Sequence, residues 1–220
     1  MSVKAITEED IKTLETLAAK YPERRSALLP MLHYVQAIQG MVSPAGIQVC
    51  AKVLDLTPAE VAAVATFYTM YKRFPMGKHH IGVCVNTLCA LLGGDDLWKE
   101  LTDTLGIGHD ETTADGLFTL ERIECQAACT VAPVMTVNWE FMDSMNPTLL
   151  RDLINKLKSG APVQSTRGVK ITTISDSQRV LAGINDGKYQ ESPLADDSML
   201  AGLRVAKERN MSAPVGKGAN

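Results

Sequence analysis

The sequence has almost no net charge and lacks a long apolar run. Its 22 Lys and Arg residues nearly balance its 25 Asp and Glu residues, which leaves a formal charge of −3. Because nucleic acids and anionic membranes attract basic surfaces, we expect no nucleic-acid partner. No charge-free apolar stretch is long enough to cross a bilayer, so we also expect no direct membrane insertion.

A secretory signal is also missing, and cysteine is scarce. Residues 1–6 lead directly into the acidic run Glu8-Glu9-Asp10 without the apolar core of a signal peptide. We therefore expect a cytosolic protein, in which ordinary thiols stay reduced. There, paired cysteines more often indicate metal or redox chemistry than structural disulfides. The chain has only five cysteines, so their spacing is informative.

Four of the five cysteines form two close pairs, Cys84-x4-Cys89 and Cys125-x3-Cys129, each on a loop that follows a predicted strand. Thiolates are soft ligands that select zinc, copper(I) or iron–sulfur clusters. A set of four suits either a structural zinc ion or a [2Fe–2S] cluster, and the long loops favour the wider cluster only modestly. Cys50 lies in an apolar helix and is interpreted as an inert buried thiol.

Three other interpretations of the cysteine pairs have less support. Disulfides conflict with the missing secretory signal. A thioredoxin-type dithiol needs C-x-x-C spacing, which neither pair has. A Rieske-type centre needs histidine ligands. None of the histidines lies inside a cysteine pair, and we predict all of them to be surface or core residues: His33, His79, His80 and His109.

Residues 1–76 are predicted to form an N-terminal helical bundle. Apolar side chains recur there at helical spacing, and hydroxyl residues followed by proline or acidic residues indicate helix starts. The run Pro75-Met76-Gly77 indicates a domain boundary. These signals predict helices from Thr7 to about Pro22 and over residues 26–39, 44–54 and 58–72. Because proline is unfavourable inside a helix, the alternative start of the second helix is Leu29 or Pro30.

Residues 77–160 are predicted to form an α/β domain, because the apolar period changes from helical to two. A helix between the first two strands predicts a right-handed parallel crossover, and the close connection between the next two predicts antiparallel pairing. This outline is the thioredoxin-like arrangement with a small mixed sheet, so the predicted fold class is α+β. The expected strands are 79–85, 117–124, 134–137 and a short 139–141, and the expected helices are 91–105 and 147–158.

Residues 161–220 are predicted to be a C-terminal extension. Gly, Pro, Ser, Asp and Asn become frequent, and the apolar residues fall in two short islands that are too small to bury a core of their own. The extension is either a disordered tail or an arm that docks on a partner. Residues 198–207 favour the arm, because their apolar residues have helical spacing.

Segments in both halves match a known pattern. In the α/β half they are 82–89 (GVCVNTLC), Gly93-Gly94, 111–129 (ETTADGLFTLERIECQAAC) and Ala132-Pro133. In the helical half they are 54–61 (LDLTPAEV) and 65–69 (ATFYT). Together they resemble the thioredoxin-fold [2Fe–2S] subunit of the NADH-oxidising module of respiratory complex I. The resemblance covers residues 5–160 and leaves out the extension.

The resemblance implies that Cys84, Cys89, Cys125 and Cys129 bind one [2Fe–2S] cluster, as cofactor-binding and metal-ligating residues. It implies a partner flavoprotein subunit that carries FMN and the NADH site and exchanges electrons with the cluster. A larger iron–sulfur subunit of the same hetero-oligomeric module is expected as well. The complex is expected to have its peripheral arm on the cytoplasmic face of the inner (plasma) membrane.

No catalytic residue is predicted in this chain. No G-x-G-x-x-G follows a strand, and Gly93-Gly94 alone is too weak a signal for dinucleotide binding. We therefore expect a non-catalytic electron-transfer subunit of an NADH:quinone oxidoreductase. The alternatives are the equivalent subunit of an NAD-linked hydrogenase or formate dehydrogenase, a zinc-bound interaction module with four cysteine ligands, and a stand-alone ferredoxin. The helical bundle and the extension argue against the last.

Overall fold

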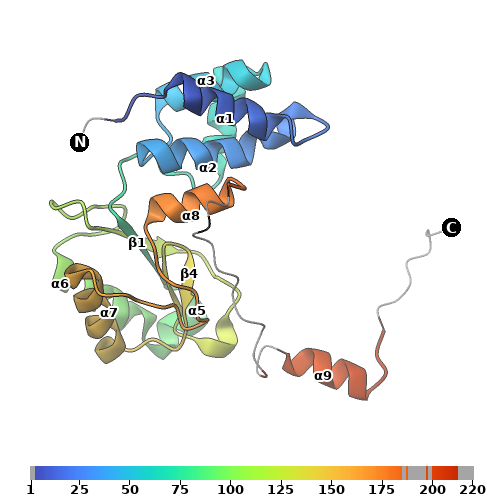
Figure 1. Ribbon diagram of the computed structural model, residues 1–220. Helices are drawn as coiled ribbons and strands as arrows, with labels where there is room; N and C mark the ends of the chain where they lie inside the picture. The colour runs from blue at the N-terminus through green and yellow to red at the C-terminus, as the bar shows by residue number, and fades with distance from the viewer. Residues whose placement is uncertain (1–2, 185–186, 188–196, 198–199, 213–220) are drawn as a thin grey trace.

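The computed structural model describes residues 3–184, 187, 197 and 200–212. It has a helical half and an α/β half with a small sheet, so the predicted fold class is confirmed (Figure 1). None of the helices within the described residues is long and apolar enough to cross a membrane.

The helical half begins its helices where the sequence predicts caps. The side chains of Thr7, Ser43 and Thr57 accept hydrogen bonds from main-chain amides one turn later, which satisfies otherwise unpaired donors. Apolar faces from these helices enclose a single buried core. The elements are α1 (Glu8–Ala18), the short turn η1 (Arg24–Ala27), α2 (Leu28–Gln39), α3 (Pro44–Leu54) and α4 (Pro58–Phe67).

Three predicted helix boundaries in this half differ from the structure. The first helix ends at Ala18 before Pro22 is reached, and the second starts at Leu28 after a 3-10 turn, between Ser26 and the alternative start at Leu29 or Pro30. The largest difference is in α4, which ends at Phe67 instead of residue 72. Tyr68 is already extended, with φ −97° and ψ 128°. The following main chain is held by the helical half, because the N–H of Lys72 donates to Gln36 Oε1 over 2.6 Å. Tertiary partners therefore replace the last helical turn.

The α/β half contains a four-stranded mixed sheet of order β2-β1-β3-β4. β1 and β2 are parallel, whereas β3 is antiparallel to both β1 and β4, as predicted for the closely connected pair. The strands are β1 (His79–Cys84), β2 (Phe118–Ile123), β3 (Met135–Val137) and β4 (Glu140–Met142). The other elements are α5 (Thr87–Cys89), η2 (Ala90–Gly94), α6 (Asp95–Leu105), η3 (Cys129–Val131) and α7 (Pro147–Ser159).

The two faces of the sheet have different roles. Ile81 and Val83 of β1 and Leu120 of β2 pack in one apolar core with residues of α6 and α7. Because side chains alternate along a strand, His80 and Cys84 point to the opposite face, and so does Glu121 of β2. The cysteine therefore shares a face with the buried charged residues.

Part of the predicted extension packs against both halves. Val163 and Ile171 are buried in the α/β core, and Ala182 is buried in the helical core. Between them, α8 (Ile174–Leu181) lies alongside α2 (Figure 1). By contrast, α9 (Ala201–Glu208) has no buried residue. The alternative of a disordered tail concerns residues 161–220, some of which lie outside the described residues.

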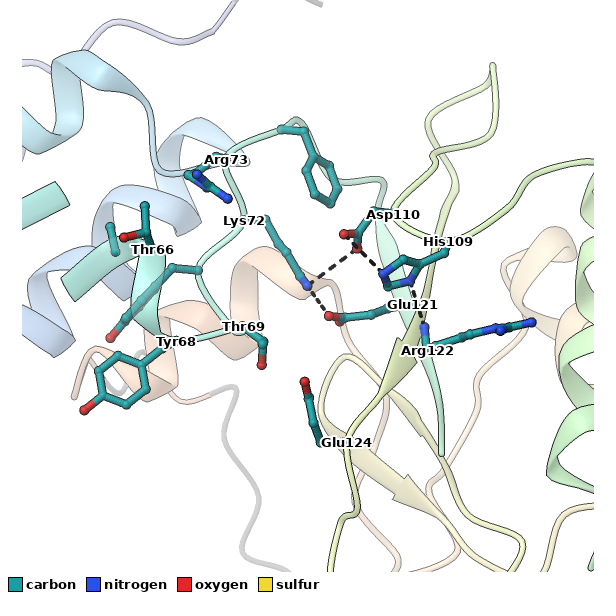
Figure 2. Close-up of a pocket in the computed structure, with 13 residues that line it drawn as sticks. Thr66, Tyr68, Thr69, Lys72, Arg73, His109, Asp110, Glu121, Arg122 and Glu124 are labelled. Carbon is teal, nitrogen blue, oxygen red and sulfur yellow. Dashed lines mark hydrogen bonds and ion pairs between the residues drawn. The ribbon is translucent and has the colours of Figure 1, made fainter. Parts of the chain in front are cut away.

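Lys72 ties the two halves together. Its main-chain carbonyl accepts from the Val42 N–H over 2.7 Å, so its backbone belongs to the helical half. Its ammonium group forms a buried ion pair with Glu121 of β2 and lies 3.7 Å from Asp110 Oδ1 (Figure 2). The position of β2, which leads to Cys125, is therefore fixed relative to the helices.

The Glu121 carboxylate is held charged by two neighbours. Burial alone would raise the pKa of Glu121, but hydrogen bonds and charge interactions with His80 and Lys72 outweigh it and lower that pKa. His80 Nε2 lies 2.8 Å from Glu121 Oε2. The result is a buried arrangement in which a single carboxylate joins β1, β2 and the helical half.

A Lys72→Met variant should be strongly destabilised. The Lys72 and Glu121 side chains are only 5% and 6% exposed, so the change leaves a buried carboxylate without its ammonium partner. Breaking a buried pair from one side costs about 3–5 kcal/mol, which urea unfolding would measure. The double variant Lys72→Met/Glu121→Gln should recover most of this loss, because the unpaired charge is gone. A single variant within about 1 kcal/mol of the parent would contradict the ion pair's role.

Candidate metal centre

Two adjacent parallel strands deliver the candidate cysteines. Cys84 is the last residue of β1, and its register partner on β2 is Ile123, two residues before Cys125. Because parallel strands end at the same edge of a sheet, the loops that carry both pairs start side by side. Cys89 ends the short helix α5, and Cys129 starts the turn η3.

The two pairs differ in burial. Cys84 and Cys89 are 2% and 4% exposed, whereas Cys125 and Cys129 are exposed to solvent. All four are free thiols, so the disulfide alternative has no support in the structure. Cys125 Sγ lies 4.0 Å from Cys129 Sγ. One side of the candidate site is therefore shielded by protein, and the other is open.

The thiols influence one another's ionisation. Burial raises the pKa of Cys89 above its ordinary value, the Cys84 thiol adds to the increase, and a hydrogen bond with the Val134 main chain opposes it. The hydrogen bond with Cys125 raises the pKa of Cys129, with a further contribution from Cys84. These interactions connect the first cysteine loop with the second.

As the side chains stand, no group of three or more His, Cys, Asp or Glu residues among the described residues is arranged to hold a metal ion. The structure thus brings the two cysteine loops together without aligning all four sulfurs as ligands. The set Cys84, Cys89, Cys125 and Cys129 therefore stays a prediction.

The chemistry of the site nevertheless fits a soft metal centre. Cys84 and Cys89 pack with Ile123 and Val134 in a small apolar cluster, which lowers the exposure of the donors to water. Asn86 Nδ2 lies 3.7 Å from Cys84 Sγ and donates to the Ile123 carbonyl over 3.3 Å. Such amide donors are typical around metal-bound sulfur. The residues present could hold either a [2Fe–2S] cluster or a zinc ion.

Each histidine has a partner away from the cysteines. His33 Nδ1 contacts Gln178 Oε1, and His109 Nδ1 accepts from the Arg122 N–H. His79 contacts Asn138, and burial lowers the pKa of His79 to about 4, with Lys78 contributing. His80 contacts Glu121. The contacts thus agree with the prediction of surface or core histidines.

Burial alone explains the behaviour of Cys50. This thiol is fully buried in α3, and burial raises its pKa to about 12. It is therefore protonated at neutral pH, and thiolate is the form that binds metal. The structure agrees with its interpretation as an inert thiol.

Gly94 packs against the main chain of both cysteines in the first pair. A Cβ atom at this position would lie 2.7 Å from the Cys84 carbonyl oxygen and 2.8 Å from that of Cys89. Main-chain atoms cannot rotate away as a flexible side chain can. Only glycine therefore allows η2 to lie this close to the loop.

A Gly94→Ala variant should consequently be destabilised by about 1–3 kcal/mol and retain less metal, as judged by urea unfolding and metal analysis. Gly202 of α9 provides a matched control, because nothing lies within 4 Å of a Cβ added there. Gly202→Ala should stay within about 0.5 kcal/mol of the parent. Equal behaviour of the two variants would show that the close packing at Gly94 is not required.

Sequence reasoning missed two features of the site. Glu121 lies on the face of β2 opposite to Phe118 and Leu120, where the period-two pattern predicts a solvent-exposed side chain, yet it is buried. The sequence does not identify its partner as Lys72. Ala127, inside the second cysteine loop, has a φ of 54°. Nothing about an alanine in the sequence indicates that left-handed conformation.

The chain is similar to several known proteins. The family described as "Thioredoxin-like [2Fe-2S] ferredoxin" matches residues 14–158. The E subunit of the NADH-quinone oxidoreductase of Mycobacterium tuberculosis is 49% identical over 205 residues, which cover 93% of this chain and 81% of the relative. A match of that length necessarily includes α8. NADH-quinone oxidoreductase subunit 2 of Thermus thermophilus is 42% identical over 150 residues, which cover 67% of this chain and 83% of the relative.

A solved structure shares the fold. The crystal structure of an NAD+-reducing [NiFe]-hydrogenase in the air-oxidized state aligns with a TM-score of 0.55 and 22% identity. The alignment covers 61% of this chain and 23% of the hydrogenase chain. At this identity the likeness concerns the fold alone.

Proposed function

Because the chain belongs to the thioredoxin-like [2Fe-2S] ferredoxin family, we propose that it is the electron-transfer subunit of an NADH:quinone oxidoreductase. In this proposal it holds one [2Fe–2S] cluster on Cys84, Cys89, Cys125 and Cys129. The observation that carries the proposal is that two parallel neighbouring strands, β1 and β2, lead into loops with four free thiols. The 49% identity to an NADH-quinone oxidoreductase subunit that matches 93% of this chain supports the parent complex.

Each part of the chain has a role in this proposal. When bound, the cluster supplies reversible one-electron transfer. The apolar cluster around Cys84 and Cys89 keeps water away from one side, and Asn86 offers its amide to the Cys84 sulfur. Hydrogen bonds to cluster sulfur and exclusion of solvent both change a reduction potential. The exposed pair Cys125 and Cys129 faces outward, toward a redox partner.

The partner subunits belong to the proposal as well. The sequence offers no dinucleotide-binding loop, so FMN and NADH are assigned to a flavoprotein subunit that exchanges electrons with this chain. A larger iron–sulfur subunit of the same module completes the assembly, on the cytoplasmic face of the membrane. This chain then has no catalytic residue and carries out no hydride transfer by itself.

The first test is the identity of the metal. The purified chain should be brown, contain about two irons, lose its visible absorption with dithionite and show an EPR signal when reduced. A colourless protein with one zinc ion would instead identify an interaction module with four cysteine ligands.

The second test is the identity of the companions. Purification of the native assembly through a tag on this chain should yield an FMN-containing subunit together with quinone reductase activity. Co-purification with a nickel-containing or formate-oxidising subunit would assign the chain to a hydrogenase or formate dehydrogenase. Elution as a solitary monomer would favour a stand-alone ferredoxin.

A further inference from the structure

The end of α4 exposes two aromatic side chains. Phe67 is 78% exposed, and Tyr68 is 44% exposed. The two rings pack edge to face at 4.9 Å between centroids, and Tyr68 packs in the same way on the buried Tyr71 at 6.1 Å. This stack is anchored in the helical core at one end and open to solvent at the other. Rigid exposed aromatic side chains of this kind are typical of the central anchors in protein interfaces.

A cleft of about 410 Å³ lies beside this aromatic stack (Figure 2). One wall comes from the end of α4 and the residues after it, with Thr66, Thr69 and Arg73. The other wall comes from β2 and its flanking loops, with His109, Arg122 and Glu124. Residues of both halves therefore line the cleft, which lies where the Lys72–Glu121 ion pair joins the two halves.

The charges in the cleft exclude a simple anion as its ligand. Lys72 at the floor already pairs with Glu121 and Asp110. Among the described residues, neither Arg73 nor Glu124 forms an ion pair, and they lie on opposite walls. The Arg122 guanidinium lies over the Trp98 ring, 4.8 Å from its centroid, and Arg73 is opposed by the Glu124 carboxylate on the other wall. A phosphate or nucleotide would therefore meet charges of both signs. A polypeptide segment with side chains of both signs matches this arrangement.

The cleft also borders the candidate metal centre. Glu124 comes directly before Cys125, whose exposed thiol belongs to the less covered pair. A protein seated on Phe67 and in the cleft would consequently lie against the open side of the site. A redox partner needs that position, whereas a purely structural partner does not.

We infer that Phe67, Tyr68 and the adjoining cleft form the docking surface for a segment of the flavin-carrying partner subunit. This inference rests on the proposed function for the identity of the partner. The aromatic stack supplies the apolar anchor, and Arg73 and Glu124 select a segment that carries both an acidic and a basic side chain. The flavin is thereby brought next to the exposed cysteine loop.

The test uses the full chain co-expressed with the FMN-carrying subunit, with affinity measured for the purified pair. Phe67→Ala and Arg73→Glu should each weaken binding at least about tenfold, as expected for a central anchor and for a charge placed against its like. Leu149→Ala is the matched control, because Leu149 is 47% exposed on α7, which packs on the other face of the sheet. The control should bind within about twofold of the parent.

Two outcomes would overturn the docking surface. One is binding by both variants as tight as that of the control. The other is a photo-crosslinker at position 67 that captures a second copy of this chain instead of the flavoprotein. Iron content, measured in parallel, separates this inference from the proposed cluster. A parent chain without iron would contradict the cluster, while weaker flavoprotein binding by Phe67→Ala would still support the docking surface.

Discussion

A Cys125→Ser variant should lose most of its iron. The hydroxyl of serine is a hard, weakly acidic ligand, whereas iron–sulfur clusters select soft thiolate. Cys125 is also exposed, so solvent can reach a ligand position that no longer holds the metal. We expect iron to fall several-fold from about two per chain, or the EPR signal of the reduced protein to change its g-values. Metal analysis and EPR of the purified variant would measure both.

Cys50 provides the matched control for this experiment. It is the remaining cysteine of the chain and lies buried in α3, in the helical core and away from the paired loops. Cys50→Ala removes a thiol of the same kind and should leave iron content and EPR unchanged. Its expected effect is a loss of packing in the helical core. An unchanged EPR signal in Cys125→Ser would exclude Cys125 as a ligand, and loss of iron in Cys50→Ala would make the Cys125 result nonspecific.

Truncation after Gly160 should unfold much of the chain. It removes Val163 and Ile171 from the α/β core and Ala182 from the helical core, together with the whole of α8. Each large buried apolar side chain contributes about 1.5–3 kcal/mol, so the total loss is comparable with the stability of a typical domain. Unfolding in urea, followed by circular dichroism, would show a far lower midpoint or no cooperative transition.

The control for this truncation is a chain that ends at Ile184. It keeps α8 and the strand-like pairing of Gln164 with Lys170, and it removes α9, which has no buried residue. The free energy of unfolding should stay within about 1 kcal/mol of the full chain, because surface changes seldom cost more. If the chain ending at Gly160 unfolds with the same midpoint as this control, the packing of residues 163–182 contributes nothing to stability.

Local signals explain which parts of the fold could be predicted. The capping residues Thr7, Ser43 and Thr57 lie within three positions of the amides they bind, so a short window of sequence reveals them. The change from helical to period-two spacing near Lys78 is equally local. It locates β1 within one residue of its observed end at Cys84.

Features that depend on distant residues could not be predicted. The sequence predicts a helix up to residue 72, yet the backbone leaves the helix after Phe67 because Gln36 binds the main chain of Lys72. Helix α8 was not expected at all, since residues 161–220 alone contain too few apolar residues for a core. Its partner is α2, and Ser175 Oγ donates to the Ala37 carbonyl across 138 positions of sequence.

Some features of the candidate site could likewise be predicted from the sequence, and others are seen only in the structure. The spacing of the four cysteines and their places after two predicted strands follow from the sequence. The sequence also narrows the expected metal centre to an iron–sulfur cluster or zinc, without deciding between them. The structure adds that one pair is buried and the other exposed, and that Gly94 packs on the first loop. The burial of a thiol depends on the residues that pack around it. For Cys84 and Cys89 these include Ile123 of β2 and Val134 next to β3, the two strands that flank β1 in the sheet.

The sequence by itself determined where α1, α3 and α4 begin, where strands lead into thiols and which metals those thiols could bind, because each depends on residues a few positions apart. The tertiary structure alone decided that Lys72 pairs with Glu121, that α8 joins the helical half and that residues of both halves line one cleft. These pairings join residues far apart in the sequence. Their free energy comes from burial and charge pairing that exist only once the two halves have come together.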